Sequence, residues 1–189
     1  MNRITPNLDR VVVIGSSGSG KSTLAAALAG ALGSHHMELD ALHWKPNWVP
    51  SPVEEFRERV ALAAAGERWV ADGNYGGVRD LLWTRATTII WLNYSFPVTF
   101  SRVLRRTFHR AITRQELYSG NRESLTTAFF SKESILLWVI TTWRRRRRDF
   151  SVLMRDERYR HVEFVVFDAP RDTARFLADV VGRGGNIPL

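Results

Sequence analysis

Short apolar runs recur along the chain, and stretches with helical periodicity lie between them. Five runs rich in β-branched or aromatic residues predict strands, at residues 11–14, 36–39, 68–71, 87–92 and 162–167. The intervening stretches predict helices at residues 21–32, 52–65, 78–83, 96–112, 131 to the mid-150s, and 171–181. Strands that alternate with helices in this way predict an α/β fold with a mainly parallel, five-stranded sheet.

Glycine, proline and hydroxyl residues mark the ends of these elements. Gly33 follows the first helix and predicts its C-terminal stop. Ser51 predicts the N-cap of the second helix, with Pro52 in its first turn, and Ser131 predicts the N-cap of the long helix. Residues 41–50 are rich in proline and tryptophan, so we expect an ordered loop there rather than a regular element.

A glycine-rich segment joins the first strand to the first helix and matches the phosphate-binding motif G-x-x-x-x-G-K-[ST]. Its residues are Gly15, Ser16, Ser17, Gly18, Ser19, Gly20, Lys21, Ser22 and Thr23. In such a loop, backbone N–H groups and the helix N-terminus bind phosphate oxygens. The lysine reaches the β- and γ-phosphates, and the hydroxyl after it ligates Mg²⁺. The motif therefore predicts ATP and Mg²⁺ as ligands, whereas the alternative is a flexible Gly/Ser turn.

Acidic residues follow the second and third strands, where a parallel sheet presents its carboxyl ends and binds ligands. Asp72 is a candidate Mg²⁺ ligand beside Ser22, although an Asp-Gly turn without a ligand is the alternative. Asp40 is placed to orient or deprotonate a hydroxyl acceptor, although a helix or loop cap is the alternative. His43 and Trp44 follow Asp40 and are candidates for contact with the acceptor.

Trp44 and Trp48 could stack on a ring of the acceptor, or they could hold the loop onto the core. The adjacent His35 and His36 have no third ligand at metal-binding spacing, which favours an ordinary surface or core role.

The charge distribution adds a feature that the apolar pattern does not show. The chain has 27 Lys and Arg against 19 Asp and Glu, a net charge of +8. Residues 101–160 hold 15 of these basic residues against 6 acidic ones, so the excess of this segment is +9 and that of the rest is −1. There is no cysteine, which excludes disulfides and cysteine-ligated metal centres. The question is which anion the basic segment meets.

Two groups of arginines make up most of this excess. Arg102, Arg105, Arg106 and Arg110 recur at helical spacing and favour a lid that binds a transferring phosphoryl group. Residues 144–148 are five consecutive arginines, which cannot all face one ligand on a helix. Some must be solvated or paired, for example with Glu116, Glu123 or Asp149. A solvated, salt-bridged helical hairpin and a nucleic-acid surface are the alternatives for the segment.

The order of these features resembles adenylate-kinase-like P-loop kinases. Stretches at residues 38–44, 72–75, 78–80, 120–124 and 130–136 resemble most closely the bacterial proteins known as DNA topology modulation proteins or adenylate-kinase-related ATPases. The resemblance covers residues 8–180 and implies an ATP site at the glycine-rich loop. It also implies that Arg102, Arg105 and Arg106 are lid residues. These three arginines, with Lys21 and Asp40 from the arguments above, are the candidate catalytic residues.

The same resemblance places Asp72 where adenylate kinases have the Asp-Gly of an Asp-Gly-Phe-Pro-Arg motif. Here Asn74 and Tyr75 replace Phe-Pro, and the nearest arginine is Arg79. These three residues are candidates for substrate binding, and the broken motif argues against AMP as the acceptor.

Together these features predict one P-loop NTPase domain over residues 1–189, a three-layer fold with residues 101–155 as a lid-like helical insertion. The predicted function is an ATP-dependent phosphotransferase acting on a nucleoside, a nucleoside monophosphate or another small molecule. A nucleic-acid-associated ATPase and a nucleotide-binding regulator remain as alternatives. The sequence has no apolar stretch of membrane-spanning length and no evident targeting signal, so we expect a cytoplasmic monomer or homodimer.

Overall fold

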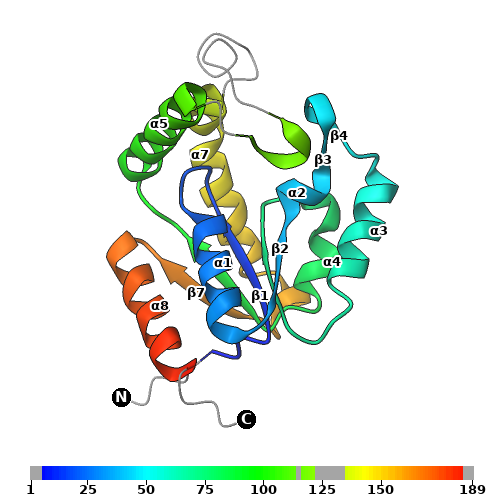
Figure 1. Ribbon diagram of the computed structural model, residues 1–189. Helices are drawn as coiled ribbons and strands as arrows, with labels where there is room; N and C mark the ends of the chain where they lie inside the picture. The colour runs from blue at the N-terminus through cyan, green and yellow to red at the C-terminus, as the bar shows by residue number, and fades with distance from the viewer. Residues whose placement is uncertain (1–5, 114–115, 122–134, 185–189) are drawn as a thin grey trace.

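A five-stranded parallel sheet forms the centre of the protein (Figure 1). The computed structural model describes residues 6–113, 116–121 and 135–184. The strands lie in the order β2-β5-β1-β6-β7, and every neighbouring pair is parallel. Their bounds are β1 Arg10–Gly15, β2 His35–Glu38, β5 Trp69–Asp72, β6 Thr88–Leu92 and β7 Glu163–Phe167. The predicted α/β class and parallel sheet are confirmed.

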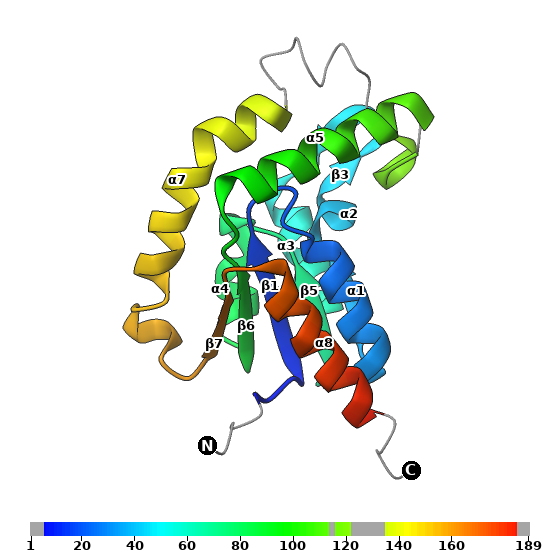
Figure 2. The same ribbon diagram turned by 90° about the vertical axis from the view of Figure 1, so that its left-hand side faces the viewer.

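Helices cover both faces of this sheet (Figures 1 and 2). Their bounds are α1 Lys21–Leu32, α2 Leu39–His43, α3 Val53–Ala63, α4 Arg79–Trp83, α5 Phe96–Thr113, α7 Ile135–Leu153 and α8 Pro170–Gly184. Short 3-10 turns are η1 Pro46–Trp48, η2 Gly76–Val78, η3 Tyr118–Gly120 and η4 Glu157–Tyr159. No helix in the described ranges is long and apolar enough to cross a bilayer.

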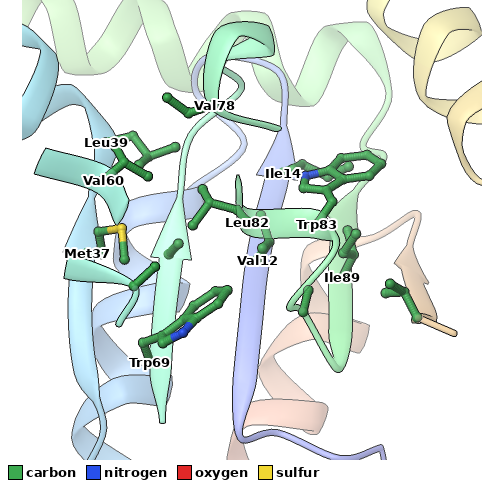
Figure 3. Packing of buried hydrophobic residues seen from close by; sticks show 14 of the residues in the cluster. Val12, Ile14, Met37, Leu39, Val60, Trp69, Val78, Leu82, Trp83 and Ile89 are labelled. Atoms are coloured by element: carbon green, nitrogen blue, oxygen red, sulfur yellow. The ribbon is translucent and has the colours of Figure 1, made fainter. Parts of the chain in front are cut away.

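Alternating side chains of β1, the central strand, pack into two separate apolar cores. Val12 and Ile14 pack on the face covered by α3, α4 and α7, in a cluster that Figure 3 shows from close by. Val11 and Val13 pack on the opposite face, against α1 and α8. All four are at most 1% exposed, which is why their run reads as continuously apolar rather than alternating. A fully buried side chain of this kind contributes about 1.5–3 kcal/mol.

The segment between β2 and α3 differs most from the prediction. β2 ends at Glu38, and Leu39 and Asp40 already belong to α2 because the Leu39 side chain turns into the core and is 1% exposed. The loop expected over residues 41–50 contains a small antiparallel hairpin of β3 Trp44–Lys45 and β4 Val49–Pro50 around η1.

The bounds of α3 and its N-cap also differ from the prediction. α3 starts at Val53 and ends at Ala63, two residues before the predicted end. Ser51 is not its N-cap, since its hydroxyl donates to the carbonyl oxygen of Leu42 at 3.4 Å. Gly33 does end α1, in a left-handed conformation with φ 59°. The predicted cap Ser131 and the predicted partner Glu123 lie outside the described residues, as do parts of the stretches 120–124 and 130–136.

The polypeptide between β6 and β7 contains the basic segment. It forms α5, η3 and α7, and a small apolar contact involving Val103 and Val139 joins the two long helices. α5 lies across the carboxyl end of the sheet, where β1 runs into α1 (Figure 2). The insertion therefore lies over the edge at which the strands deliver Gly15, Glu38 and Asp72.

Candidate active site

The glycine-rich loop curls tightly between β1 and α1. Gly15, Gly18 and Gly20 have φ values of 150°, 80° and 91°, a region that side chains disfavour. A Cβ at Gly18 would lie 2.3 Å from Cγ2 of Val103 and 2.7 Å from the carbonyl oxygen of Thr99, so α5 packs directly on the loop. Gly20 caps α1 without a side chain, which leaves the first N–H groups of the helix for an anion.

Asn74 holds the start of this loop through both ends of its amide. Its Nδ2 donates to the Gly15 carbonyl oxygen at 2.6 Å, and its Oδ1 accepts from the Gly15 N–H at 3.2 Å. Asn74 was a candidate for substrate binding, and in the structure its side chain holds the backbone of the loop. Inside the curl, the Ser19 hydroxyl is buried and has no hydrogen-bond partner in the described part of the chain. A loop shaped in this way, with an unsatisfied polar atom inside, fits a phosphate chain.

Asp72 lies at the end of β5 and is bound on both oxygens. Ser22 Oγ donates to Oδ1 at 2.7 Å, and His36 Nε2 contacts Oδ2 at 2.9 Å. Asp72 is 2% exposed. The hydroxyl and carboxylate oxygens fit Mg²⁺, which usually takes one or two protein ligands and fills its other positions with phosphate oxygens and water. A larger cluster is not needed, and within the described ranges no group of three or more acidic, His or Cys side chains gathers at one point.

Lys21 is the first residue of α1 and turns back over the loop. Its Nζ donates to the Ser16 carbonyl oxygen at 3.3 Å. Burial lowers the pKa of Lys21 from 10.5 to about 8, against the opposing effect of Asp40 and Asp72. The positive charges of Arg146 and Arg106 lower this pKa further. The charges of two carboxylates and two guanidinium groups thus act on the space around the Lys21 ammonium.

Asp40 faces this space from α2 and is held by Tyr75. The Tyr75 hydroxyl donates to Asp40 Oδ1 at 2.5 Å, and burial together with the Asp40 charge raises the pKa of Tyr75. His43 packs between aromatic rings, with its centroid 4.8 Å from Phe56 and 4.7 Å from Tyr75, and burial lowers the pKa of His43. The Asp40 carboxylate is therefore oriented by Tyr75, which belongs to a cluster of aromatic rings around His43.

The loop after α2 is tied to the insertion. Asn121 donates through Nδ2 to the Lys45 carbonyl oxygen at 2.9 Å and accepts from the Trp48 N–H at 2.9 Å. Ser119 Oγ donates to the Trp44 carbonyl oxygen at 2.7 Å, and the Tyr118 hydroxyl donates to Glu38.

The backbone at this contact is strained on both sides. Asn47, Trp48 and Ser119 are the non-glycine residues with positive φ in the described ranges, and all three lie here. Trp44 and Trp48 meet edge to face with centroids 5.6 Å apart, which agrees with the interpretation that they hold the loop in place. We call residues 44–50 the acceptor loop.

The arginines predicted for the lid differ in their contacts and in their exposure. Arg102 donates from Nη1 to the Ser19 carbonyl oxygen at 3.2 Å and lies over the Tyr94 ring. Arg106 is half-buried and is close enough to Lys21 to affect its pKa, whereas Arg105 is exposed. Arg79, predicted for the acceptor, lies over the Trp83 ring at 5.3 Å and lines a narrow crevice with Tyr75.

Sequence reasoning missed three residues of this site. His36 was given an ordinary surface or core role, but it lies within β2, which pairs in register with β5, and its side chain reaches Asp72. Arg146 was not separated from its neighbours, although Thr142 and Phe150, one turn to either side, are buried and place it on the inner face. Asn121 gave no local signal, because its partners are more than 70 positions away.

Comparison with known proteins identifies the fold but no sequence family. No protein-family profile and no curated protein matches this sequence, and the closer resemblance to DNA topology modulation proteins finds no support there. A gluconokinase from Sinorhizobium meliloti 1021 superimposes with a TM-score of 0.53 at 20% identity, over 96% of this chain and 94% of that chain. A shikimate kinase from Bacteroides thetaiotaomicron does so with a TM-score of 0.51 at 15% identity, over 90% and 95%. The chain thus has the three-layer α/β fold of P-loop kinases.

Proposed function

We propose that the protein is an ATP-dependent phosphotransferase that acts on a hydroxyl group of a small molecule. One observation carries the proposal: the Lys21 ammonium lies on the glycine-rich loop, and the carboxylates of both Asp72 and Asp40 act on its charge. A binding module for a nucleotide needs the loop and the Ser22–Asp72 pair. A second carboxylate that acts on the lysine, held in place by Tyr75, is what a second, nucleophilic substrate requires.

On the nucleotide side, the chain supplies charge and fixed dipoles. The backbone of the loop and the N-terminus of α1 bind phosphate oxygens, and Lys21 and Arg102 place positive charge where negative charge shifts during transfer. Ser22 and Asp72 would hold Mg²⁺, which, when bound, neutralises charge on the phosphates. His36 keeps the second oxygen of Asp72 in place.

On the acceptor side, Asp40 orients the nucleophile. Its carboxylate would accept a hydrogen bond from the acceptor hydroxyl and take its proton as the new bond to phosphorus forms. Tyr75 donates to one Asp40 oxygen, so the other oxygen is available for the acceptor. The aromatic rings around His43 exclude water from this side, which limits transfer to water.

The test is acceptor-dependent release of ADP, read together with the phosphorylated product. The assay takes ATP and Mg²⁺ with a panel of nucleosides, nucleoside monophosphates, sugars and small hydroxy acids. Lys21→Ala should lower kcat by about 10³-fold on any accepted substrate, because it removes the charge that stabilises the transferring group. Arg158→Ala is the control, since the exposed Arg158 guanidinium pairs with Asp156 at 2.6 Å at η4, before the start of β7, and its loss should leave kcat within about twofold.

Two results would contradict the proposal, each in a different part. Full activity of Lys21→Ala would remove the mechanism. Release of ADP that no acceptor stimulates would indicate an ATPase or a nucleotide-dependent regulator, and salt-sensitive binding of DNA or RNA in that case would indicate a nucleic-acid partner.

Asp40→Asn separates a hydroxyl acceptor from a phosphate acceptor. The amide keeps the shape and can still bond to Tyr75, but it cannot take a proton. We expect kcat to fall by about 10²- to 10⁴-fold on a hydroxyl acceptor, with nucleotide affinity unchanged. Nucleoside monophosphates would be the better acceptor class if the variant keeps its kcat, because a phosphate nucleophile at neutral pH carries no proton to remove.

A further inference from the structure

The run of arginines at 144–148 divides by exposure. Arg144, Arg145 and Arg148 are exposed, whereas Arg146 and Arg147 are half-buried, and Arg147 lies over the Trp143 ring at 4.8 Å. Arg146 lies one helical turn from Thr142 and one turn from Phe150, and both of these are 5% exposed. Helical geometry therefore turns Arg146 inward while its exposed neighbours face water.

The surroundings of Arg146 are those of the acceptor side of the site. The groups that act on its charge include Tyr75 and Asp40, together with Arg145 and Asp149 on its own helix. Phe150, one turn along, lines the same crevice as Tyr75 and Arg79. Arg146 in turn acts on the charge of Lys21. The guanidinium thus lies near the place where the acceptor must meet the transferring group.

Within the described residues, Arg146 makes a ring contact but no ion pair. Its guanidinium carbon lies 5.5 Å from the centroid of the Trp138 ring, and no hydrogen bond or ion pair of Arg146 occurs within the described ranges. Burial lowers the pKa of Arg146, as expected for a cation that has lost water without gaining an anion. A half-buried arginine in this condition is well suited to bind a carboxylate or a phosphate through two parallel hydrogen bonds.

The nucleotide does not need this arginine. Its phosphates are served by the loop backbone, Lys21 and the N-terminus of α1, with Arg102 packed against the loop at Ser19. Arg102 lies over Tyr94, after β6, whereas Arg146 lies toward Tyr75, after β5. The two arginines thus come from two helices of the insertion, α5 and α7, and have different neighbours.

We infer that Arg146 binds an anionic group of the acceptor, so that the acceptor is a small molecule carrying both a hydroxyl and a carboxylate or phosphate. The hydroxyl lies at Asp40 and the anionic group at Arg146. The inference rests on the proposed function, because it assigns the two ends of the substrate of that reaction. A neutral sugar or nucleoside would leave the Arg146 charge without a partner.

The experiment measures binding, so it does not depend on turnover. Isothermal titration of the protein, saturated with ADP and Mg²⁺, uses two matched pairs of compounds: gluconate against glucitol, and glycerol 3-phosphate against glycerol. We expect the anionic member of at least one pair to bind ten times more tightly or better than its neutral partner. The pair that shows the difference distinguishes a carboxylate from a phosphate.

Variants then assign the difference to Arg146. Arg146→Gln should reduce the preference for the anion by about 10- to 100-fold, in line with the loss of a charge-assisted hydrogen bond, and should leave ADP affinity within about twofold. Arg145→Gln, one residue away and exposed, is the matched control and should keep the full preference. Arg146→Lys retains the charge but loses the two-pronged geometry, so a partial preference is expected.

The other outcomes overturn the inference. Equal affinity for both members of each pair would do so, and so would weaker ADP binding in Arg146→Gln with unchanged binding of the anion. An Arg146-dependent preference for the anion in a protein that never transfers phosphate would leave the inference standing and would contradict the proposed function instead. A melting curve of each variant shows whether a loss of binding comes from unfolding.

Discussion

The edge of the sheet and the helical insertion above it handle charge in different ways. At the edge, few charged groups are present, and the carboxylates among them bond to neighbouring polar side chains, as in Ser22–Asp72–His36 and Tyr75–Asp40. In the insertion, charge is dense, yet many arginines point to water. Under the proposed function, the dense charge of the insertion serves to bind an anion, whereas the hydrogen-bonded groups at the strand ends carry out the chemistry.

The difference follows from backbone geometry. Parallel strands in register deliver their last residues to one edge, so Glu38 and Asp72 are aligned by pairing alone. A helix distributes consecutive residues around its axis at 3.6 per turn, so five neighbouring arginines must face several directions. A site on strands can therefore be recognised from sequence position, while a site on a helix requires knowledge of the buried face.

The largest expected effect lies where the two regions touch. Gly18→Ala places a Cβ 2.3 Å from Val103 of α5 and also requires an alanine at φ 80°. Overpacking of about 1–3 kcal/mol and a left-handed backbone of about 1–2 kcal/mol together predict a loss of about 3 kcal/mol. In a chain of this length, that lowers Tm by about 6–12 °C in differential scanning calorimetry.

Gly33→Ala is the control for this substitution. Gly33 also has positive φ, at 59°, but nothing lies within 4 Å of a Cβ there. This variant should lose about 1 kcal/mol from the backbone alone. If both variants lose the same free energy of unfolding, α5 is not closely packed against the glycine-rich loop.

The second-largest expected effect is a fall of the ADP affinity with rising pH, caused by the titration of Lys21. The pKa of Lys21 is about 8 in the free protein because burial outweighs the nearby carboxylates. A bound phosphate raises this pKa, so nucleotide binding takes up a proton. The affinity is fully present below pH 8 and falls as the pH rises toward the bound-state pKa. Between pH 7 and pH 9 we expect about a tenfold loss of ADP affinity by titration calorimetry.

Lys21→Arg checks the origin of this slope. Arginine stays charged throughout the range, so the variant should bind ADP with a nearly constant affinity from pH 7 to pH 9. A slope that persists in the variant would assign the proton to another group.

The smallest effect belongs to the outer arginines. Arg144→Gln combined with Arg148→Gln removes two exposed charges. We expect unchanged kcat and a free energy of unfolding within about 0.5 kcal/mol of the original, because solvated charges contribute little. A large loss of activity would contradict the division between inward and outward arginines in α7.

The central strand, the glycine-rich loop and the first helix could be predicted from the sequence, because their local sequence signals agree with the overall fold. The strand at Val11–Ile14, the glycine-rich loop and the helix that ends at Gly33 each have a signal within a few residues. The alternation of strands and helices then leaves few arrangements other than a parallel sheet. The positions of Lys21, Ser22 and Asp72 follow from this framework.

The acceptor side could not be predicted to the same extent. Asp40 was expected at the end of a strand, but burial of Leu39 starts a helix one residue earlier. The hairpin of the acceptor loop depends on Asn121, which no pattern near residues 44–50 reveals. Arg146 could have been found from the spacing of Val139, Thr142 and Phe150 on the buried face of its helix.

The bonds between Asn121 and the acceptor loop have a consequence for engineering. The loop owes its shape to a turn encoded more than 70 residues later in the chain, and both sides carry strained backbone at Trp48 and Ser119. Grafting residues 44–50 alone into another protein of this fold would transfer their side chains without their conformation. An exchange of substrate preference should therefore move residues 44–50 and 118–121 as one cassette.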